Sequence, residues 1–430
     1  MSEGRVRASW GALFFAWSLL AVFRAPTYHL WLFALVATEW GHWLAAPALL
    51  TLAPGWRRTR GGRAGAVLGL SAAVLFLSPV ARAAREFGLS WSGPAPLVLP
   101  RLWLGAPVPA VREESLVYAR ACGDELRLQL YRPMVAAGRL PVVLVVHGGS
   151  WQSGSRLEMP ELSRELAGRG YAVASIDYGL APRNEYPAPV DDLRDAAAFL
   201  RDHAGELSLD MNRVVLLGRS AGGQIVLAAA AASDPIPGVR GVVDFYGPND
   251  MRLAWTIPGS PWILDSRRLL SQYIGGAPAE YPERYDEASA LLRAGPKFPP
   301  TLMIHGGRDE LVWPVHELRL SARLAALGVP HDYLELPWAT HGCDYAFNGP
   351  CGQITTFEVE RFLGRVLGGA PPFAATYPDR SVESTRTRVA IIRPWAWTLI
   401  WKTNSARSWT PRWTRTAGWP RPGRRGIRRT

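Results

Sequence analysis

Five continuous apolar runs alternate with helix-like stretches between residues 141 and 307, and this alternation constrains the fold more than any other feature of the chain. The runs read PVVLVVHGG, YAVASIDYG, RVVLLGRS, GVVDFYG and PTLMIHGG. Runs without polar alternation indicate strands that are buried on both faces, and amphipathic stretches such as residues 191–203 supply the crossover helices. We therefore predict a mostly parallel α/β sheet flanked by helices, with an antiparallel pair at 115–121 and 125–131 before it.

Three further apolar runs lie in the first hundred residues, at 10–23, 30–53 and 64–81. Crossing a bilayer takes roughly 18–20 apolar residues, so the first run is short. A cleavable signal peptide would be a single run, which the later runs argue against. We expect residues 1–90 to form a membrane anchor with two or three transmembrane helices. A helical hairpin of a soluble core is the alternative.

Arginines near these runs predict the orientation of the anchor. Four arginines lie in the loop between the second and third runs, at positions 57, 58, 60 and 63. Arg5 and Arg7 precede the first run, and Arg24 lies in the loop between the first and second runs. Basic loops stay in the cytoplasm, so we expect a multi-pass protein of the cell (inner) membrane whose large domain is extracytoplasmic. Glu39 and His42 are expected at an interface or facing another helix rather than in a proton relay.

The formal net charge of +12 comes from the end of the chain. Residues 386–430 contain twelve Lys or Arg and no acid, so residues 1–385 sum to about zero and we expect no nucleic-acid partner. We divide the chain after the anchor into a linker at 91–110, a catalytic domain at 111–370 and a basic, Trp-rich tail at 371–430. Disorder and an interfacial membrane anchor both stay open for the tail. Cys343 and Cys351 could form a disulfide in an oxidising compartment or remain two separate thiols.

A serine stands between glycines where a buried run meets a helical pattern, in Gly218-Arg219-Ser220-Ala221-Gly222. A G-x-S-x-G sequence in this context is typical of a nucleophile elbow, in which glycines allow a sharp turn that presents the serine hydroxyl. The following helix offers its N-terminus to developing negative charge. We therefore predict that Ser220 is a nucleophile.

A nucleophilic serine needs a base and an acid that orients the base. His341 follows the last apolar run, YLEL, on a loop before a glycine, and is the best candidate for the base. His147 and His305 each end a buried strand, a position that favours structural packing. Asp309 follows the strand that ends at Ile304 and is the candidate acid, with the neighbouring Glu310 as the alternative.

The segment VVHGGSW supplies candidate donors for an oxyanion. The N–H groups of Gly148 and Gly149 can approach a substrate oxygen because no Cβ obstructs them, and Ala221 would supply a third N–H. The Trp- and Pro-rich stretch 251–292 fits no sheet element, so we expect a cap-like excursion there. Candidates for lining the substrate pocket are Trp151, Arg219, Trp255 and Trp262.

From about Leu116 to Leu367 the chain resembles the α/β-hydrolase superfamily. The nearest resemblance is to esterases related to hormone-sensitive lipase and to feruloyl-esterase-like and prenylcysteine-methylesterase-like carboxylesterases. It is carried by HGGSW at 147, DYGLAP at 177, YPAPVDD at 186, GRSAGG at 218, HGGRDELV at 305 and HG at 341. The resemblance implies the nucleophile, acid, base and oxyanion-hole residues that are predicted above from the residue pattern. Gly179 replaces the usual arginine of the second motif, and Arg219 precedes the nucleophile where relatives often carry an acid or a small residue.

These features predict a membrane-anchored serine carboxylic ester hydrolase that forms an acyl-enzyme intermediate and needs no metal or organic cofactor. Its expected partners are a small-molecule or lipid-like ester and the membrane. Amide or formamide hydrolysis and acyl transfer remain alternatives on the same triad. A non-catalytic, membrane-tethered binding protein on this fold is a further alternative.

Overall fold

A mixed sheet organises the C-terminal two-thirds of the molecule. The computed structural model describes residues 2–121, 124–136 and 138–368, so the predicted tail at 371–430 lies outside the described residues. Within them the sheet has eight strands in the order β1-β2-β4-β3-β5-β6-β7-β8. Their bounds are β1 Val111–Ala121, β2 Asp124–Pro133, β3 Leu140–Val146, β4 Ala172–Ile176, β5 Leu209–Arg219, β6 Val239–Phe245, β7 Thr301–Gly306 and β8 His331–Leu336. We call residues 111–368 the sheet domain.

Strand directions agree with the prediction of a mostly parallel sheet. Strand β2 pairs antiparallel with β1 and β4, whereas every neighbouring pair from β4 through β3 to β8 is parallel. The carboxyl ends of β3 and β5 to β8 therefore meet at one edge. In such sheets this edge gathers functional groups.

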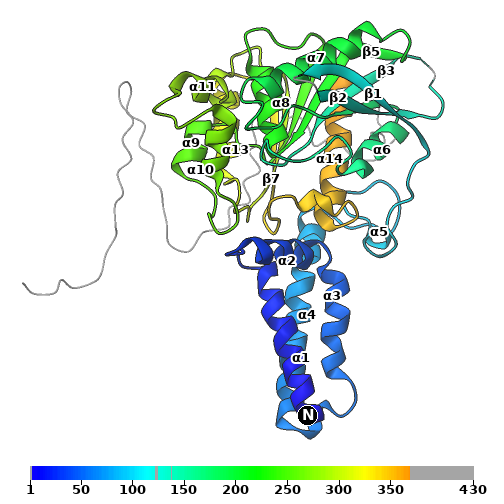
Figure 1. Cartoon of the computed structure of the whole chain (residues 1–430). Coiled ribbons are helices and arrows are strands. Elements are labelled where there is room, and N and C mark those ends of the chain that lie inside the picture. Colours follow the sequence, from blue (N-terminus) through cyan, green and yellow to red (C-terminus); the bar gives the residue numbers. More distant parts are fainter. Residues whose placement is uncertain (1, 122–123, 137, 369–430) are drawn as a thin grey trace, which may run out of the picture. The chain divides into compact units, whose positions relative to one another are not determined.

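Helices cover both faces of the sheet (Figure 1). In β3, Val142 and Leu144 belong to one core cluster and Val143 and Val145 to another, as expected for a strand buried on both faces. Residues of α7 (Ala188–Asp202), α8 (Ala221–Ala231) and α13 (Val315–Ala326) complete the first cluster. Residues of α6 (Pro160–Gly168) and α14 (Pro350–Leu367) complete the second.

The excursion predicted between β6 and β7 consists of short helices in the described chain. They are α9 Met251–Thr256, α10 Ser266–Ile274, α11 Pro282–Glu287 and α12 Ala290–Arg293. Figure 1 shows α9, α10 and α11 beside the sheet. Leu270, Tyr273 and Tyr285 are buried in the same core cluster as α8, which fixes the excursion to the sheet domain.

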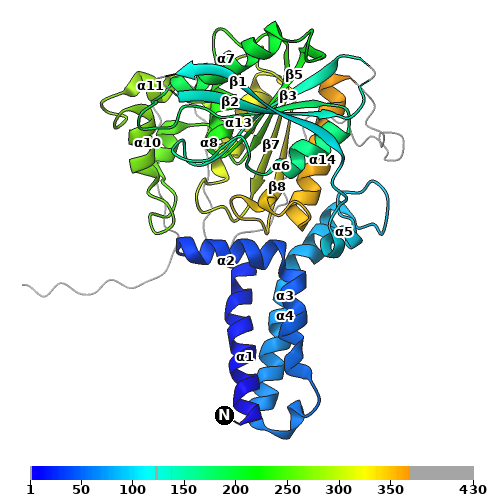
Figure 2. The same cartoon turned by 45° about the vertical axis from the view of Figure 1, so that its right-hand side comes forward.

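The N-terminal residues form helices α1 (Glu3–Ser18), α2 (Tyr28–Glu39), α3 (Gly41–Leu49) and α4 (Arg60–Phe87). In Figures 1 and 2, α1, α3 and α4 lie side by side and α2 runs across their ends. A short helix, α5 (Leu99–Leu104), lies between α4 and the sheet domain.

Among the described helices, α4 alone is long and apolar enough to cross a membrane. The apolar run 30–53 is not one continuous helix, because the chain leaves the helical conformation at Trp40, which divides the run into α2 and α3. Polar groups on either side of this break contact other parts of the chain. The carboxylate of Glu39 accepts the N–H of Cys351 at 2.9 Å, and His42 Nε2 lies 2.8 Å from the Leu102 carbonyl oxygen. The number of crossings stays a prediction.

Glycines allow α1 and α4 to pack with their backbones in contact. A Cβ added to Gly11 would lie 2.5 Å from the carbonyl oxygen of Gly65, closer than real Cβ contacts. Small residues at helix crossings are typical of helices that associate in a membrane, where dispersion contacts between backbones replace the hydrophobic driving force.

We expect Gly11→Ala to destabilise the N-terminal helices by about 1–3 kcal/mol, because the added methyl group overpacks the crossing. Alanine would otherwise stabilise a helix by about 1 kcal/mol relative to glycine, so the sign of the change is diagnostic. The measurement is the Tm of the detergent-solubilised full chain. Gly205→Ala, in the turn after α7, is the control for adding a methyl group in open space, because its Cβ would meet no atom within 4 Å. A Tm for Gly11→Ala equal to or above that of the control would contradict the close crossing.

Candidate active site

Ser220 stands at the sharp turn between β5 and α8, in a conformation that side chains rarely adopt. Its φ of 54° lies in the left-handed region, and it is the residue that precedes the first turn of α8. The turn needs both flanking glycines: a Cβ on Gly218 would lie 2.1 Å from the carbonyl oxygen of Gly222, and one on Gly222 would lie 2.2 Å from that of Val146. The G-x-S-x-G sequence is therefore the steric requirement of this turn.

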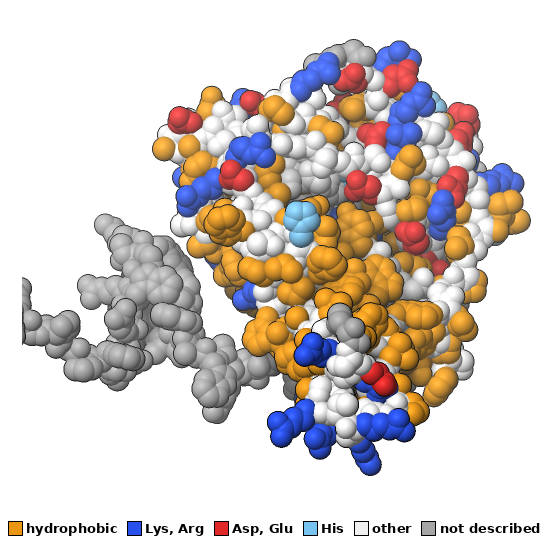
Figure 3. Space-filling model, turned by 60° about the horizontal axis from the view of Figure 1, so that its bottom comes forward, with side chains coloured by type: hydrophobic (Ala, Val, Ile, Leu, Met, Phe, Trp, Pro, Cys, Tyr) orange, Lys and Arg blue, Asp and Glu red, His pale blue; other side chains and the backbone are white. Residues whose placement is uncertain are grey.

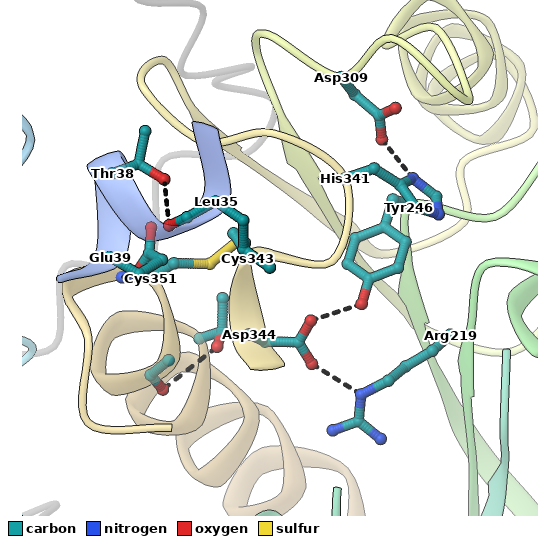
Figure 4. Close-up of a disulfide and its surroundings, with 12 residues drawn as sticks. Leu35, Thr38, Glu39, Arg219, Tyr246, Asp309, His341, Cys343, Asp344 and Cys351 are labelled. Carbon is teal, nitrogen blue, oxygen red and sulfur yellow. Dashed lines mark hydrogen bonds and ion pairs between the residues drawn. A yellow bond between two sulfur atoms is a disulfide. The ribbon is translucent and has the colours of Figure 1, made fainter. Parts of the chain in front are cut away.

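The structure brings Ser220, His341 and Asp309 into one line of hydrogen bonds. The hydroxyl of Ser220 lies 3.0 Å from Nε2 of His341, and Nδ1 of His341 lies 2.6 Å from Oδ2 of Asp309. Because the carboxylate accepts a hydrogen bond from Nδ1–H, the proton of the neutral ring is on Nδ1, and Nε2 can accept a proton from the serine. Figure 4 shows the Asp309 carboxylate directed at the His341 ring.

Asp309 is fully buried yet remains ionised. Burial by itself raises the pKa of this carboxyl, but the His341 and His305 rings outweigh it and hold the pKa below its ordinary range. The second oxygen, Oδ1, accepts the N–H groups of Leu311 at 2.8 Å and Val312 at 2.9 Å. These contacts fix the carboxylate as an acceptor for His341.

A second histidine contacts Asp309 on the other side, a contact that the sequence reasoning missed. His305, interpreted from sequence as structural, places Nε2 3.2 Å from Oδ2 of Asp309 and Nδ1 2.9 Å from Oε1 of Glu317. Burial lowers the pKa of His305, but the two carboxylates outweigh it and raise the pKa well above the ordinary value. The i, i+4 spacing of His305 and Asp309 in HGGRD is the signal that could have indicated the pair.

Glu310, the alternative acid, does not contact His341. Its carboxylate accepts the N–H of Ala25 at 2.7 Å and the hydroxyl of Thr340 at 2.6 Å. It therefore connects the segment between α1 and α2 with the residue that precedes the candidate base. Burial raises the pKa of Glu310.

Arg308, on the other side of Asp309, also binds the N-terminal segment. Its buried guanidinium donates to the carbonyl oxygen of Leu20 at 2.7 Å and to that of Phe23. Arg24 in turn donates to the carbonyl oxygen of Gly307 at 3.0 Å. The loop that carries Asp309 is thus held by residues from the opposite end of the sequence.

The predicted pocket residues differ in where their side chains lie. A pocket beside Ser220 and His341 is lined by Trp151, which stacks on Tyr273 with ring centroids 4.5 Å apart. Trp255 and Trp262 are not among the lining residues: Trp255 packs edge-on against Tyr285, and Trp262 is 79% exposed. The excursion lines the pocket instead with residues of α9, of α10 and of the segment between them, and the Asp309 loop lines it from another side.

Arg219 does not line the pocket either, because its guanidinium points to a buried carboxylate. Nε of Arg219 lies 2.6 Å from Oδ2 of Asp344, whose other oxygen accepts the hydroxyl of Tyr246. The Tyr246 ring packs against His341 with centroids 4.4 Å apart (Figure 4). Burial lowers the pKa of Arg219, but Asp344 outweighs it and raises the pKa, so the pair is ionic.

The two late cysteines form a disulfide next to this pair. Cys343 is bonded to Cys351, which closes the loop between His341 and α14 (Figure 4). The question that the sequence left open is therefore answered in favour of a bond. The disulfide restrains the segment that carries both the candidate base and Asp344.

Two of the predicted oxyanion donors, Gly148 and Ala221, lie close to the nucleophile. A Cβ on Gly148 would lie 3.5 Å from the Cβ of Ser220, so the backbone of the HGG turn is in contact with the elbow. Gly149 has a φ of 103°, which favours glycine. Ala221 follows Ser220 as the first residue of α8.

Comparison with known proteins identifies a family model and esterases that are similar to this chain. A family model described as BD-FAE matches residues 128–324. The chain is 32% identical over 248 residues to Esterase LipC of Mycobacterium tuberculosis, covering 54% of this chain and 60% of that protein. It is 31% identical over 260 residues to Probable carboxylic ester hydrolase LipM of the same organism, covering 57% and 58%. The chain thus spans about three-fifths of the length of these curated relatives.

Solved structures give the same fold. The Bacterial Heroin Esterase superposes with a TM-score of 0.54 and 25% identity, covering 62% of this chain and 87% of that one. The esterase Est2 of Thermogutta terrifontis superposes with a TM-score of 0.50 and 23% identity, covering 60% and 94%. The second match is evidence for the fold alone.

We expect Asp344→Asn to lower the free energy of unfolding by about 3–5 kcal/mol, because it leaves the buried Arg219 guanidinium without a counter-charge. Chemical denaturation of the full chain measures the change. Asp332→Asn is the matched control, because its ion pair with Arg365 is about half exposed on both sides. Such a pair contributes less than about 1 kcal/mol. Equal effects of the two substitutions would contradict a buried ionic pair.

Stability should also depend on pH through Asp309. Its pKa in the folded protein lies below the unfolded value, so its stabilisation is present at neutral pH and is lost as the pH falls below about 4. We predict that Asp309→Asn lowers Tm at neutral pH and that the difference from wild type shrinks between about pH 5 and about pH 2. A difference in Tm that is constant over this range would show that the carboxylate is not held ionised.

Proposed function

The chain belongs to the esterase and lipase branch of the α/β-hydrolase superfamily, and from this premise we propose that it is a membrane-anchored serine carboxylic ester hydrolase. The names of its relatives support ester hydrolysis as the reaction. The observation that carries the proposal is the line of hydrogen bonds from Ser220 through His341 to Asp309.

In the proposed reaction the oxygen of Ser220 attacks the ester carbonyl carbon while Nε2 of His341 takes the hydroxyl proton. Asp309 holds Nδ1–H and stabilises the imidazolium that forms. The tetrahedral intermediate collapses when the C–O bond to the alcohol breaks, and His341 gives its proton to the departing oxygen. Water then attacks the acyl-enzyme with the same base, which releases the acid and restores Ser220.

Developing negative charge on the carbonyl oxygen requires donors next to the nucleophile. Gly148, Gly149 and Ala221 are the proposed donors, supported by the contact between the HGG turn and the elbow. In comparable sites one such donor contributes about 3 kcal/mol to stabilising the transition state.

Membrane anchoring is supported by α4 and by the arginines around it. The helix has 28 residues, which at 1.5 Å per residue extends over about 42 Å and exceeds the roughly 30 Å of a hydrocarbon core. Four arginines lie at or just before its N-terminal end, at positions 57, 58, 60 and 63, so this end is assigned to the cytoplasm. The sheet domain then lies on the opposite side, where the disulfide between Cys343 and Cys351 would persist.

An organophosphonate that carries a fluorescent tag should label the full chain covalently, because its phosphorus accepts attack by an activated serine. We expect labelling to be lost in Ser220→Ala and to fall by a factor of about 10³ or more in His341→Ala, since the base is then missing. Gel fluorescence measures both. The matched control is Ser71→Ala in α4, which lies outside any elbow. Persistent labelling of Ser220→Ala would contradict the assignment of the nucleophile.

Protease added to intact spheroplasts should degrade the sheet domain while a cytoplasmic marker protein stays protected, because the domain is assigned to the extracytoplasmic side. An antibody against the sheet domain follows the digestion. Protection of both proteins in sealed spheroplasts, with digestion of both after lysis, would reverse the orientation.

A further inference from the structure

The pocket beside Ser220 is apolar on most of its surface. Residues from the excursion and from the Asp309 loop form its walls: Ala254, Ile257, Leu264, Leu269, Leu270, Leu311, Val312 and Trp313. Ser220 and His341 also line the pocket, so an acyl group bound there would have its ester carbonyl within reach of the nucleophile. Aliphatic walls of this kind are suited to a hydrocarbon chain.

The N-terminal segment forms part of the surroundings of this pocket. The N–H of Tyr28, at the start of α2, donates to the carbonyl oxygen of Trp262 at 3.2 Å. The guanidinium of Arg24 lies over the ring of Trp313, 5.2 Å from its centroid, and Trp313 lines the pocket. Residues 23–28 therefore lie directly beside the excursion and beside the pocket wall.

Exposed apolar side chains gather where these segments meet. Trp262 is 79% exposed and Phe23 is 62% exposed, and Tyr28 and Ile257 are also exposed. Ile257 both lines the pocket and reaches solvent, so it connects the interior of the pocket with this surface. We call these four residues the rim. Adjacent large apolar side chains in water are unfavourable and mark a surface that contacts another phase or molecule.

The rim adjoins helices that expose further apolar side chains. On α1 and α4 these include Leu13, Val67, Leu70, Val74 and Leu77. Figure 3 shows apolar side chains gathered over the face of the molecule that carries the N-terminal helices, with Lys and Arg at the near end. Because α4 has the length of a membrane span, the rim is placed at the level where a bilayer would meet the sheet domain.

We propose that the substrate is an ester carried in the lipid bilayer, whose acyl chain passes over the rim into the pocket. This proposal rests on the proposed esterase function and narrows its substrate class. The polar part of such a lipid stays in the headgroup layer, where Trp262 and Tyr28 are the residue types that favour an interface. The acyl chain moves from the bilayer directly to the apolar wall of the pocket, so it does not have to cross water to reach Ser220.

The test compares two esters on the full chain reconstituted in vesicles of phosphatidylethanolamine and phosphatidylglycerol. One is a short-chain p-nitrophenyl ester that is dissolved in the buffer, and the other is a long-chain fluorogenic ester that partitions into the vesicle. We expect wild type to hydrolyse both. We expect Trp262→Asp and Phe23→Asp each to lower the ratio of the vesicle rate to the soluble rate by about tenfold, because a carboxylate on the rim opposes insertion.

Val135→Asp is the matched control. Val135 is 86% exposed in the turn between β2 and β3, which precedes the amino end of β3 and so lies away from the edge that holds Ser220. We expect the ratio of the vesicle rate to the soluble rate in Val135→Asp to equal that of wild type. An effect seen only in the rim variants would then result from the position of the added carboxylate.

Three results would overturn the proposal. If the ratio is unchanged in both rim variants, the rim serves another contact, such as a protein partner. If wild type hydrolyses the soluble ester but not the vesicle ester, the substrate class is wrong while the esterase function stands. If wild type hydrolyses neither ester and Ser220 takes no phosphonate label, the esterase function fails as well.

Discussion

One buried carboxylate, that of Asp309, organises the candidate site. It accepts hydrogen bonds from the His341 ring and from two backbone N–H groups, and the His305 ring lies 3.2 Å away on the other side. An isolated carboxylate in such a place would be protonated, because burial disfavours the charged form. The surrounding donors reverse that tendency. The orientation of His341 depends on Asp309 remaining ionised. The ability of His341 to take the proton of Ser220 depends on that orientation.

The N-terminal helices and the site are parts of one structure. Arg308 and Glu310, on either side of Asp309, bind backbone groups of residues 20–25, and Glu39 at the end of α2 binds the backbone next to the disulfide. Both loops that carry the acid and the base are thus restrained by residues 20–39. These contacts account for the burial of the charged side chains of Arg308, Glu310 and Glu39.

Local patterns were sufficient to predict the sheet and the elbow. The apolar runs and the spacing of glycines around Ser220 depend on neighbours in sequence, as do the candidates for acid and base. Sequence could not predict the partners of Arg219 or Glu310, because Asp344 and Ala25 lie more than a hundred residues away and any of many ionisable groups could have taken their place. The break at Trp40 was missed for a related reason. Mean hydropathy is a property of the whole run. It cannot show that Glu39 and His42 find hydrogen-bond partners in distant parts of the chain.

The proposed mechanism depends on the acylation of Ser220 while His341 takes its proton. Rapid-mixing kinetics with a p-nitrophenyl ester, followed by acid quench and peptide mass spectrometry, measure this step. We expect a burst of about one p-nitrophenol per active chain before the steady state, and an acyl group on the peptide that contains Ser220. A steady rate without a burst, together with a quenched protein of unmodified mass under conditions in which deacylation is slowed, would contradict it.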